Sequence, residues 1–141
     1  MAILALVLIY AASFAIRITH GFSKTIDSPD YTVRLQILNG CGADGAANRV
    51  ARALDGLIHL PLETKIVDVD NFDSYTVEKS FIIARESDLT AAELLAEQLG
   101  LDKDDIIYEA IENNYRSITA TLVLGSNFDK ALLQPSKQRE N

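Results

Sequence analysis

The chain of 141 residues has few of the residue types that build disulfide frameworks, zinc sites and nucleic-acid surfaces. It contains one cysteine, Cys41, which excludes an intrachain disulfide and a multi-cysteine zinc site. Its 20 acidic residues outnumber its 13 lysines and arginines and give a net charge of −7. Because phosphate binding requires clustered lysine and arginine, we expect no nucleic-acid partner.

Residues suited to catalysis are also few. The only histidines, His20 and His59, stand in no recognisable partner motif, and neither is expected to meet Cys41 as a base. Aspartates gather at 68–73 and 102–105, but they lack the spacing of a calcium-binding loop and are better explained as solvated turns. We therefore expect a non-enzymatic protein with no catalytic residue, no metal and no cofactor.

The chain has a single long apolar run, at its N-terminus, with the sequence MAILALVLIYAASFAI. As a helix this run would span about 24 Å, slightly short of the roughly 30 Å hydrocarbon core of a bilayer. We predict a transmembrane signal anchor over residues 1–17, with a cleaved signal peptide or a buried or interfacial helix as alternatives. Arg17 and Lys24, taken alone, favour a cytoplasmic position for the following residues.

A polar tether is predicted over residues 18–30, a folded domain over 31–128 and a flexible tail over 129–141. The domain opens with the sequence VRLQILNGCGADGAANRVARAL, which is typical of a strand, a glycine turn and a helix. Val33, Leu35 and Ile37 alternate with polar residues, as in a half-buried strand. The helix has one apolar stripe, formed by Ala47, Val50, Ala51 and Leu54.

Further elements follow along the domain. Strands are predicted at 63–69, 79–85 and 118–125, and a further short strand at 105–110. A helix begins at a predicted capping box of Thr90 and Glu93 and ends at Gly100. The order β-α-β-β-α-(β)-β, with both helices on one face of the sheet, predicts an α+β two-layer sandwich of the ferredoxin-like, split βαβ type.

The glycine turn, Asn39 to Gly45, also fits the spacing of a dinucleotide-binding loop, with glycines at 40, 42 and 45. That function would place a pyrophosphate at the helix N-terminus and use Asp68 or Asp70 as the ribose-binding acid. Two strands in succession without an intervening helix argue against it. A purely structural turn, or a small site in which backbone N–H groups bind an anion, are the alternatives.

Several of these motifs together resemble the LytR C-terminal domain family over about residues 33–128. The matching positions are Asn39, Gly40, Gly42, Gly45, the pair Ile82-Ile83 and the closing pair Leu124-Gly125. Two positions depart from the family pattern. Cys41 stands where a small hydroxyl residue is more common, and Ser126-Asn127 replace the acid that follows the last glycine.

The resemblance implies an extracytoplasmic domain of the bacterial cell envelope, anchored in the cell membrane by one span. It implies a non-catalytic interaction module that binds cell-wall polymer or envelope proteins, with Asn39, Gly40, Gly42 and Gly45 as the first binding surface to test. The alternatives are a scaffold that binds only membrane proteins and, third, a nucleotide-binding domain that uses the glycine turn.

Overall fold

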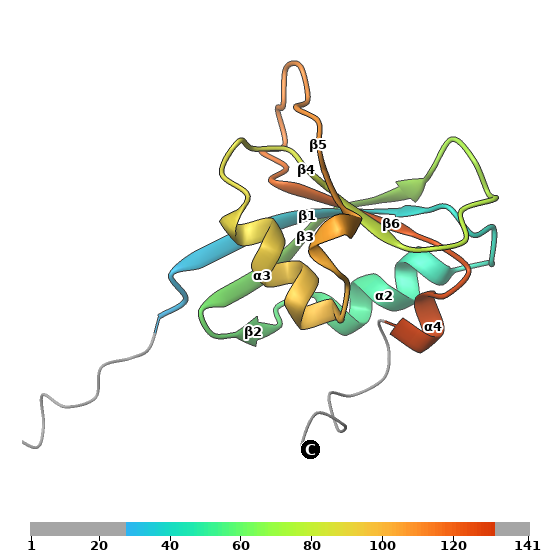
Figure 1. The fold of residues 1–141 in the computed structure, drawn as a ribbon, viewed down its shortest axis with the longest axis horizontal. Helices are drawn as coiled ribbons and strands as arrows, with labels where there is room; N and C mark the ends of the chain where they lie inside the picture. The colour runs from blue at the N-terminus through green and yellow to red at the C-terminus, as the bar shows by residue number, and fades with distance from the viewer. Residues whose placement is uncertain (1–27, 132–141) are drawn as a thin grey trace, which may run out of the picture.

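The structure is a computed structural model that describes residues 28–131 (Figure 1). The predicted anchor over 1–17 lies outside the described residues, as do most of the tether and the end of the tail. Within residues 28–131, no helix has the length and apolar character needed to cross a bilayer.

A six-stranded mixed sheet forms the centre of the domain, with the strands in the order β2-β3-β1-β6-β4-β5. Parallel pairing joins β1 to β3, β1 to β6 and β4 to β5, whereas β2–β3 and β4–β6 are antiparallel. The elements in chain order are β1 (Tyr31–Asn39), α2 (Ala46–Leu54), β2 (Ile58–His59), β3 (Leu62–Asn71), β4 (Phe81–Ala84), α3 (Thr90–Leu99), the 3-10 turn η1 (Lys103–Asp105), β5 (Ile106–Tyr108), β6 (Ala120–Leu124) and the short helix α4 (Phe128–Ala131).

The prediction of a split βαβ unit is wrong. In a split unit another strand separates the two parallel strands, but β1 and β3 pair directly along the whole of β1, from Tyr31–Leu62 to Asn39–Asn71. Residues 72–80 carry the chain past the end of the sheet, so β4 joins beyond β6 instead of between β1 and β3. The domain therefore contains two unsplit parallel units, β1-α2-β3 and β4-α3-β5.

Both helices cover one face of the sheet, as predicted, and Figure 1 shows them side by side beneath the strands. Their buried residues join one core cluster with alternate residues of the central strands. The largest fully buried side chains include Leu35, Ile37, Leu62, Ile82, Leu95, Leu122 and Leu124. Because this core lies between sheet and helices, the fold is a two-layer α/β sandwich. We call the sheet face opposite α2 and α3 the open face, although Ile83, Thr121 and Val123 at its centre are buried.

The start of α3 differs from the predicted capping box. Thr90 is the first helical residue, and its backbone N–H and hydroxyl donate to Asp88 Oδ1 at 3.0 and 2.6 Å. Glu93 points elsewhere, because its carboxylate accepts a bond of 2.8 Å from Lys103 Nζ. Asp88, two residues before the helix, therefore supplies the side-chain cap.

This cap gives the domain a pH-dependent contribution to stability. The side-chain and backbone bonds from Thr90 lower the pKa of Asp88 below its usual value. The stabilisation is therefore present above the unfolded-state pKa and is lost as pH falls through the folded-state pKa. The free energy of unfolding of the wild type should exceed that of Asp88→Asn at about pH 6, and the difference should shrink below about pH 4. Urea unfolding of both proteins at a series of pH values measures this difference. A difference that does not change with pH would contradict the role of Asp88 as the cap of α3.

Candidate functional site

The predicted binding turn is organised by the Asn39 side chain. Asn39 Oδ1 accepts the backbone N–H groups of Cys41 and Gly42, both at 3.2 Å, and its Nδ2 donates to the carbonyl of Ala43 at 2.9 Å. The Cys41 thiol also points to Asn39 Oδ1, at 3.3 Å. The N–H groups that an anion would need at this point are therefore already bound by a buried asparagine.

Each glycine of the turn is favoured at its position for a different physical reason. A Cβ at Gly40 would lie 2.8 Å from Val77 Cγ2 and 2.9 Å from the Leu124 carbonyl, so only glycine allows this close approach. Gly42 and Gly45 have φ of 74° and 68°, in the left-handed region that glycine adopts without strain. Gly45 caps α2, and no described atom beyond its chain neighbours lies within 4 Å of the point that a Cβ would occupy there.

The segment 72–80 lies across the turn at the carboxyl end of the parallel strands. Val77 N–H donates to the Gly40 carbonyl at 3.0 Å, and Ser126 N–H donates to the Val77 carbonyl at 2.9 Å. Tyr75 packs on the turn, because a Cβ at Gly42 would be only 3.2 Å from Tyr75 Cβ. These contacts occupy the space in which a pyrophosphate would have to meet the glycine turn, which argues against dinucleotide binding.

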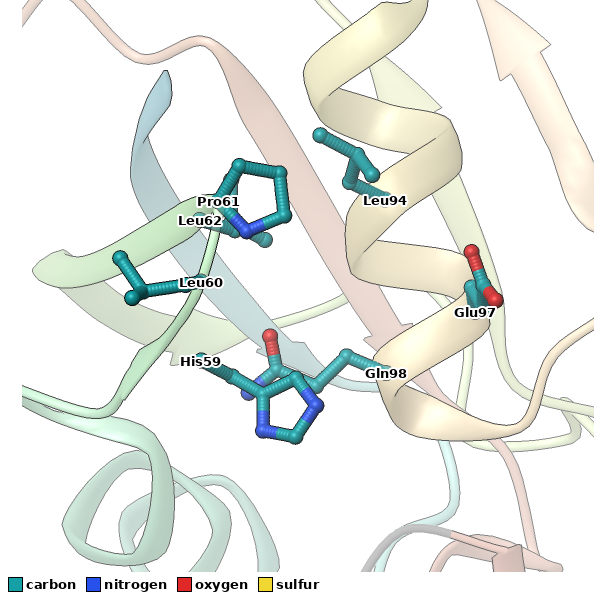
Figure 2. A pocket seen from close by; sticks show the side chains of 7 residues that line it. All are labelled: His59, Leu60, Pro61, Leu62, Leu94, Glu97 and Gln98. Atoms are coloured by element: carbon teal, nitrogen blue, oxygen red, sulfur yellow. The ribbon is translucent and has the colours of Figure 1, made fainter. Parts of the chain in front are cut away.

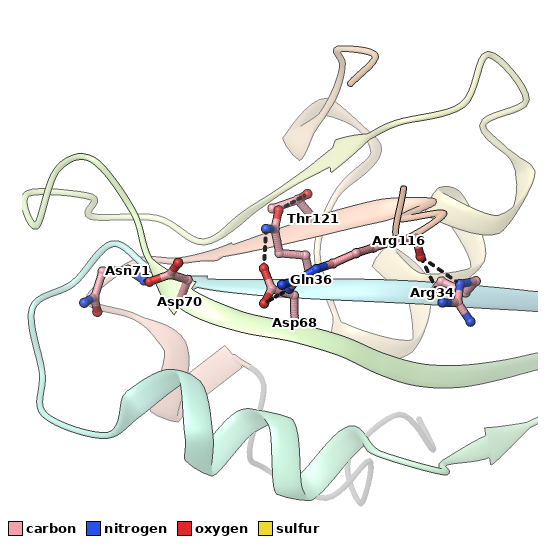
Figure 3. Close-up of polar contacts among 7 residues, drawn as sticks. All are labelled: Arg34, Gln36, Asp68, Asp70, Asn71, Arg116 and Thr121. Carbon is pink, nitrogen blue, oxygen red and sulfur yellow. Dashed lines mark hydrogen bonds and ion pairs between the residues drawn. The ribbon is translucent and has the colours of Figure 1, made fainter. Parts of the chain in front are cut away.

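The open face of the sheet carries a polar network that links β3, β1 and β6 to Arg85, the residue after β4. Figure 3 shows its part from Asp68 to Thr121. Arg85 Nε donates to Thr121 Oγ1 at 3.0 Å, whose hydroxyl donates to Gln36 Oε1 at 2.9 Å. Gln36 Nε2 donates to Asp68 Oδ2 at 2.8 Å, and Arg116 forms an ion pair with the other oxygen of that carboxylate. Asp68 is therefore engaged across the sheet and is not placed as a ribose-binding acid.

Two arginines on this face form hydrogen bonds to the segment between β5 and β6. Arg34 donates from Nε and Nη2 to the Arg116 carbonyl at 3.2 and 2.9 Å (Figure 3). Arg85 Nη1 donates to the Glu109 carbonyl at 3.0 Å, and burial lowers the pKa of the Arg85 guanidinium. No sequence motif singles these residues out. Alternation of polar with apolar residues along β1 is the signal that marks the face they share.

A cavity of about 220 Å³ lies between the β2–β3 hairpin and α3 (Figure 2). Its walls come from Leu60, Pro61, Leu62 and Leu94, with polar groups from His59, Glu97 and Gln98. The Gln98 side chain points from α3 toward His59. Both amide atoms of Gln98 are buried without a hydrogen-bond partner among the described residues. A buried, unpaired amide is costly, which marks this cavity as a second candidate site.

Replacing Gln98 with leucine tests this cost. The variant keeps a similar shape but removes the unpaired amide, so the free energy of unfolding should rise by about 1 kcal/mol. Gln98→Glu, which keeps the shape but brings a charge into the cavity, should lower it. Urea unfolding followed by circular dichroism measures both. Destabilisation by leucine would mean that the amide is paired in solution, for instance with a bound water.

The residues considered for catalysis are dispersed. Cys41 is half-buried, packs against the core cluster and bonds to Asn39, which agrees with a structural role. His59 lies in β2 beside the cavity, and His20 lies outside the described residues. Between residues 28 and 131, no group of three or more histidine, cysteine, aspartate or glutamate side chains is arranged to hold a metal ion.

Comparison with known proteins identifies the family of this fold. Residues 32–128 match the family LytR_C, described as LytR cell envelope-related transcriptional attenuator. The matched range runs from the second residue of β1 to the first residue of α4 and so covers both layers of the sandwich. Neither the curated proteins nor the solved structures gave a match. The resemblance seen in the sequence is confirmed, and the chain belongs to the LytR C-terminal domain family.

Proposed function

We propose that the protein is a membrane-anchored, non-catalytic module of the cell envelope that binds a cell-wall polymer at the Asn39–Gly45 turn. The family description, which relates the matched domain to the cell envelope, supports the general setting. The apolar run at the start of the chain supports the proposed anchor, and the envelope-related family description supports the proposed extracytoplasmic position.

The observation that carries the binding site is the position of Tyr75. Its side chain is 55 % exposed although its base packs against Gly42. The turn beneath it is held by the Asn39 bonds and by the Gly40 N–H, which donates to the Leu124 carbonyl at 3.0 Å. A tyrosine ring that packs at its base on a hydrogen-bonded turn offers an apolar face with a polar edge, which suits stacking on a sugar ring.

The test is retention of the purified full chain by isolated cell wall. Tyr75→Ala should reduce retention severalfold, because one stacked aromatic ring is worth about 1 kcal/mol or more. The matched control is Tyr115→Ala, at a side chain that is 91 % exposed in the segment between β5 and β6. Equal retention of both variants would show that Tyr75 does not belong to the binding site. If the wild type were not retained, binding of a cell-wall polymer would be excluded.

A scaffold that binds only membrane proteins is the second candidate, favoured by one edge of the sheet. The outer strand β5 exposes Ile107 and Tyr108, 48 and 56 % accessible, beside a strand edge that no other described strand pairs. Such an edge can accept a strand from another protein. Crosslinking in cells that recovers proteins through β5 but no glycan through Tyr75 would favour this function.

A further inference from the structure

Three exposed aliphatic side chains gather at one end of the domain. Leu57, Ile58 and Leu60 are 39, 57 and 48 % exposed, and they lie in or beside the short β2–β3 hairpin. We call Leu57, Ile58 and Leu60 the aliphatic tip. The surrounding sequence, GLIHLPL, contains no aspartate, glutamate, lysine or arginine. An uncharged apolar projection of this kind marks a contact surface, because single scattered apolar residues would not share one hairpin.

The described chain enters the domain beside this tip. Tyr31 N–H donates to the Pro61 carbonyl at 3.0 Å, one residue from Leu60, and Tyr31 pairs with Leu62 in the sheet. Ser28, the first described residue, is three residues earlier, within about 11 Å along the chain. Figure 1 shows the start of β1 and the β2–β3 hairpin at the same end of the sheet.

The distance from the apolar run to the tip is limited by the covalent chain. Residues 17–27 separate the apolar run from Ser28, and eleven residues span at most about 40 Å. If the run lies in a bilayer, the tip is held at high effective concentration next to that bilayer. Weak apolar contacts are then sufficient to keep it there.

We propose that the aliphatic tip inserts into the surface of the membrane in which the chain is anchored. This inference rests on the proposed membrane anchor. The net charge of −7 would be repelled by anionic lipid, so apolar contact with the bilayer interface, rather than charge attraction, holds the tip. The nine residues of β1, about 30 Å long, then direct the Asn39–Gly45 turn away from the membrane.

The experiment uses the absence of tryptophan from the chain. Ile58→Trp places the single tryptophan of the chain in the tip, and Tyr75→Trp places it at the opposite end, at positions that are 57 and 55 % exposed. Each full-length variant is reconstituted into phosphatidylcholine vesicles, with or without lipids brominated near the headgroup. The emission of Ile58→Trp should shift to shorter wavelength and be largely quenched by the brominated lipid. The emission of Tyr75→Trp should be quenched by aqueous iodide only.

The results separate the inference from the anchor on which it rests. Failure of the protein to sediment with vesicles would overturn the anchor and the inference together. Sedimentation without bromine quenching of Ile58→Trp, or with equal quenching of Tyr75→Trp, would overturn the inference alone. The tip tryptophan could instead become protected from iodide as the protein density rises, with no quenching by the brominated lipid. That result would also overturn the inference, and it would assign the tip to contact with a second copy of the chain.

Discussion

Gly125→Ala should lower the free energy of unfolding by about 3 kcal/mol, because the added methyl group has no space. A Cβ at Gly125 would lie 2.5 Å from the carbonyl carbon of Lys79 and 2.7 Å from that of Glu78. Both are backbone atoms, so no side-chain rotation can relieve the overlap. The Gly125 N–H is also fixed, since it donates to Ser80 Oγ at 2.9 Å. Urea unfolding followed by circular dichroism measures the loss.

The control for this prediction is Gly45→Ala. Gly45 has φ of 68° but open space around its Cβ position, so alanine there meets only the backbone strain of the left-handed region. That strain should cost about 1 kcal/mol. If Gly125→Ala cost no more than Gly45→Ala, the close approach of residues 78–79 to the end of β6 would be incorrect.

Asn39→Ala should have an effect of similar size, about 3 kcal/mol, because one side chain pairs several backbone groups of the turn. The alanine variant removes the acceptor of the Cys41 and Gly42 N–H groups, and it leaves the Ala43 carbonyl with only the bond from the Ala46 N–H at 3.2 Å. Asn39 itself is buried, Cys41 and Ala43 are half-buried and Gly42 is exposed, so water can replace the lost bonds only in part. If the turn binds wall polymer as proposed, this variant should also lose retention by isolated cell wall.

Asn71→Ala is the matched control for Asn39. Asn71 is the direct partner of Asn39 on β3, but it is exposed at the end of that strand. Its replacement should change the free energy of unfolding by less than about 0.5 kcal/mol. Equal losses from both variants, measured by urea unfolding, would show that the Asn39 bonds do not hold the turn.

The local elements of this fold could be predicted from residue spacing. The alternation of Val33, Leu35 and Ile37 and the stripe of Val50 and Leu54 each report a face that is buried. The two-residue strand β2 could not be found this way, because Ile58 and His59 are both exposed and leave no period to detect. The start of α3 differs from the predicted capping box for a similarly local reason, since Asp88 takes the capping role expected of Thr90.

The arrangement of strands was less accessible to prediction. Alternation shows which face of a strand is buried but not which strand is its neighbour, so the split and unsplit βαβ units have the same pattern. Which of the two units forms depends on long-range strand pairing, such as that of Leu35 in β1 with Ala120 in β6. The polar network on the open face depends on the same pairing, because Gln36 meets Thr121 only when β6 lies beside β1.

The central position of β6 has a consequence for the synthesis of the protein. β6 is the last strand of the described chain, yet it pairs with β1 on one side and β4 on the other. Until Leu124 has emerged from the ribosome, β2-β3-β1 and β4-β5 remain two fragments that β6 has not yet joined. Each fragment then presents an open strand edge of the kind that associates with other chains. Cotranslational folding of this domain must therefore await its final strand.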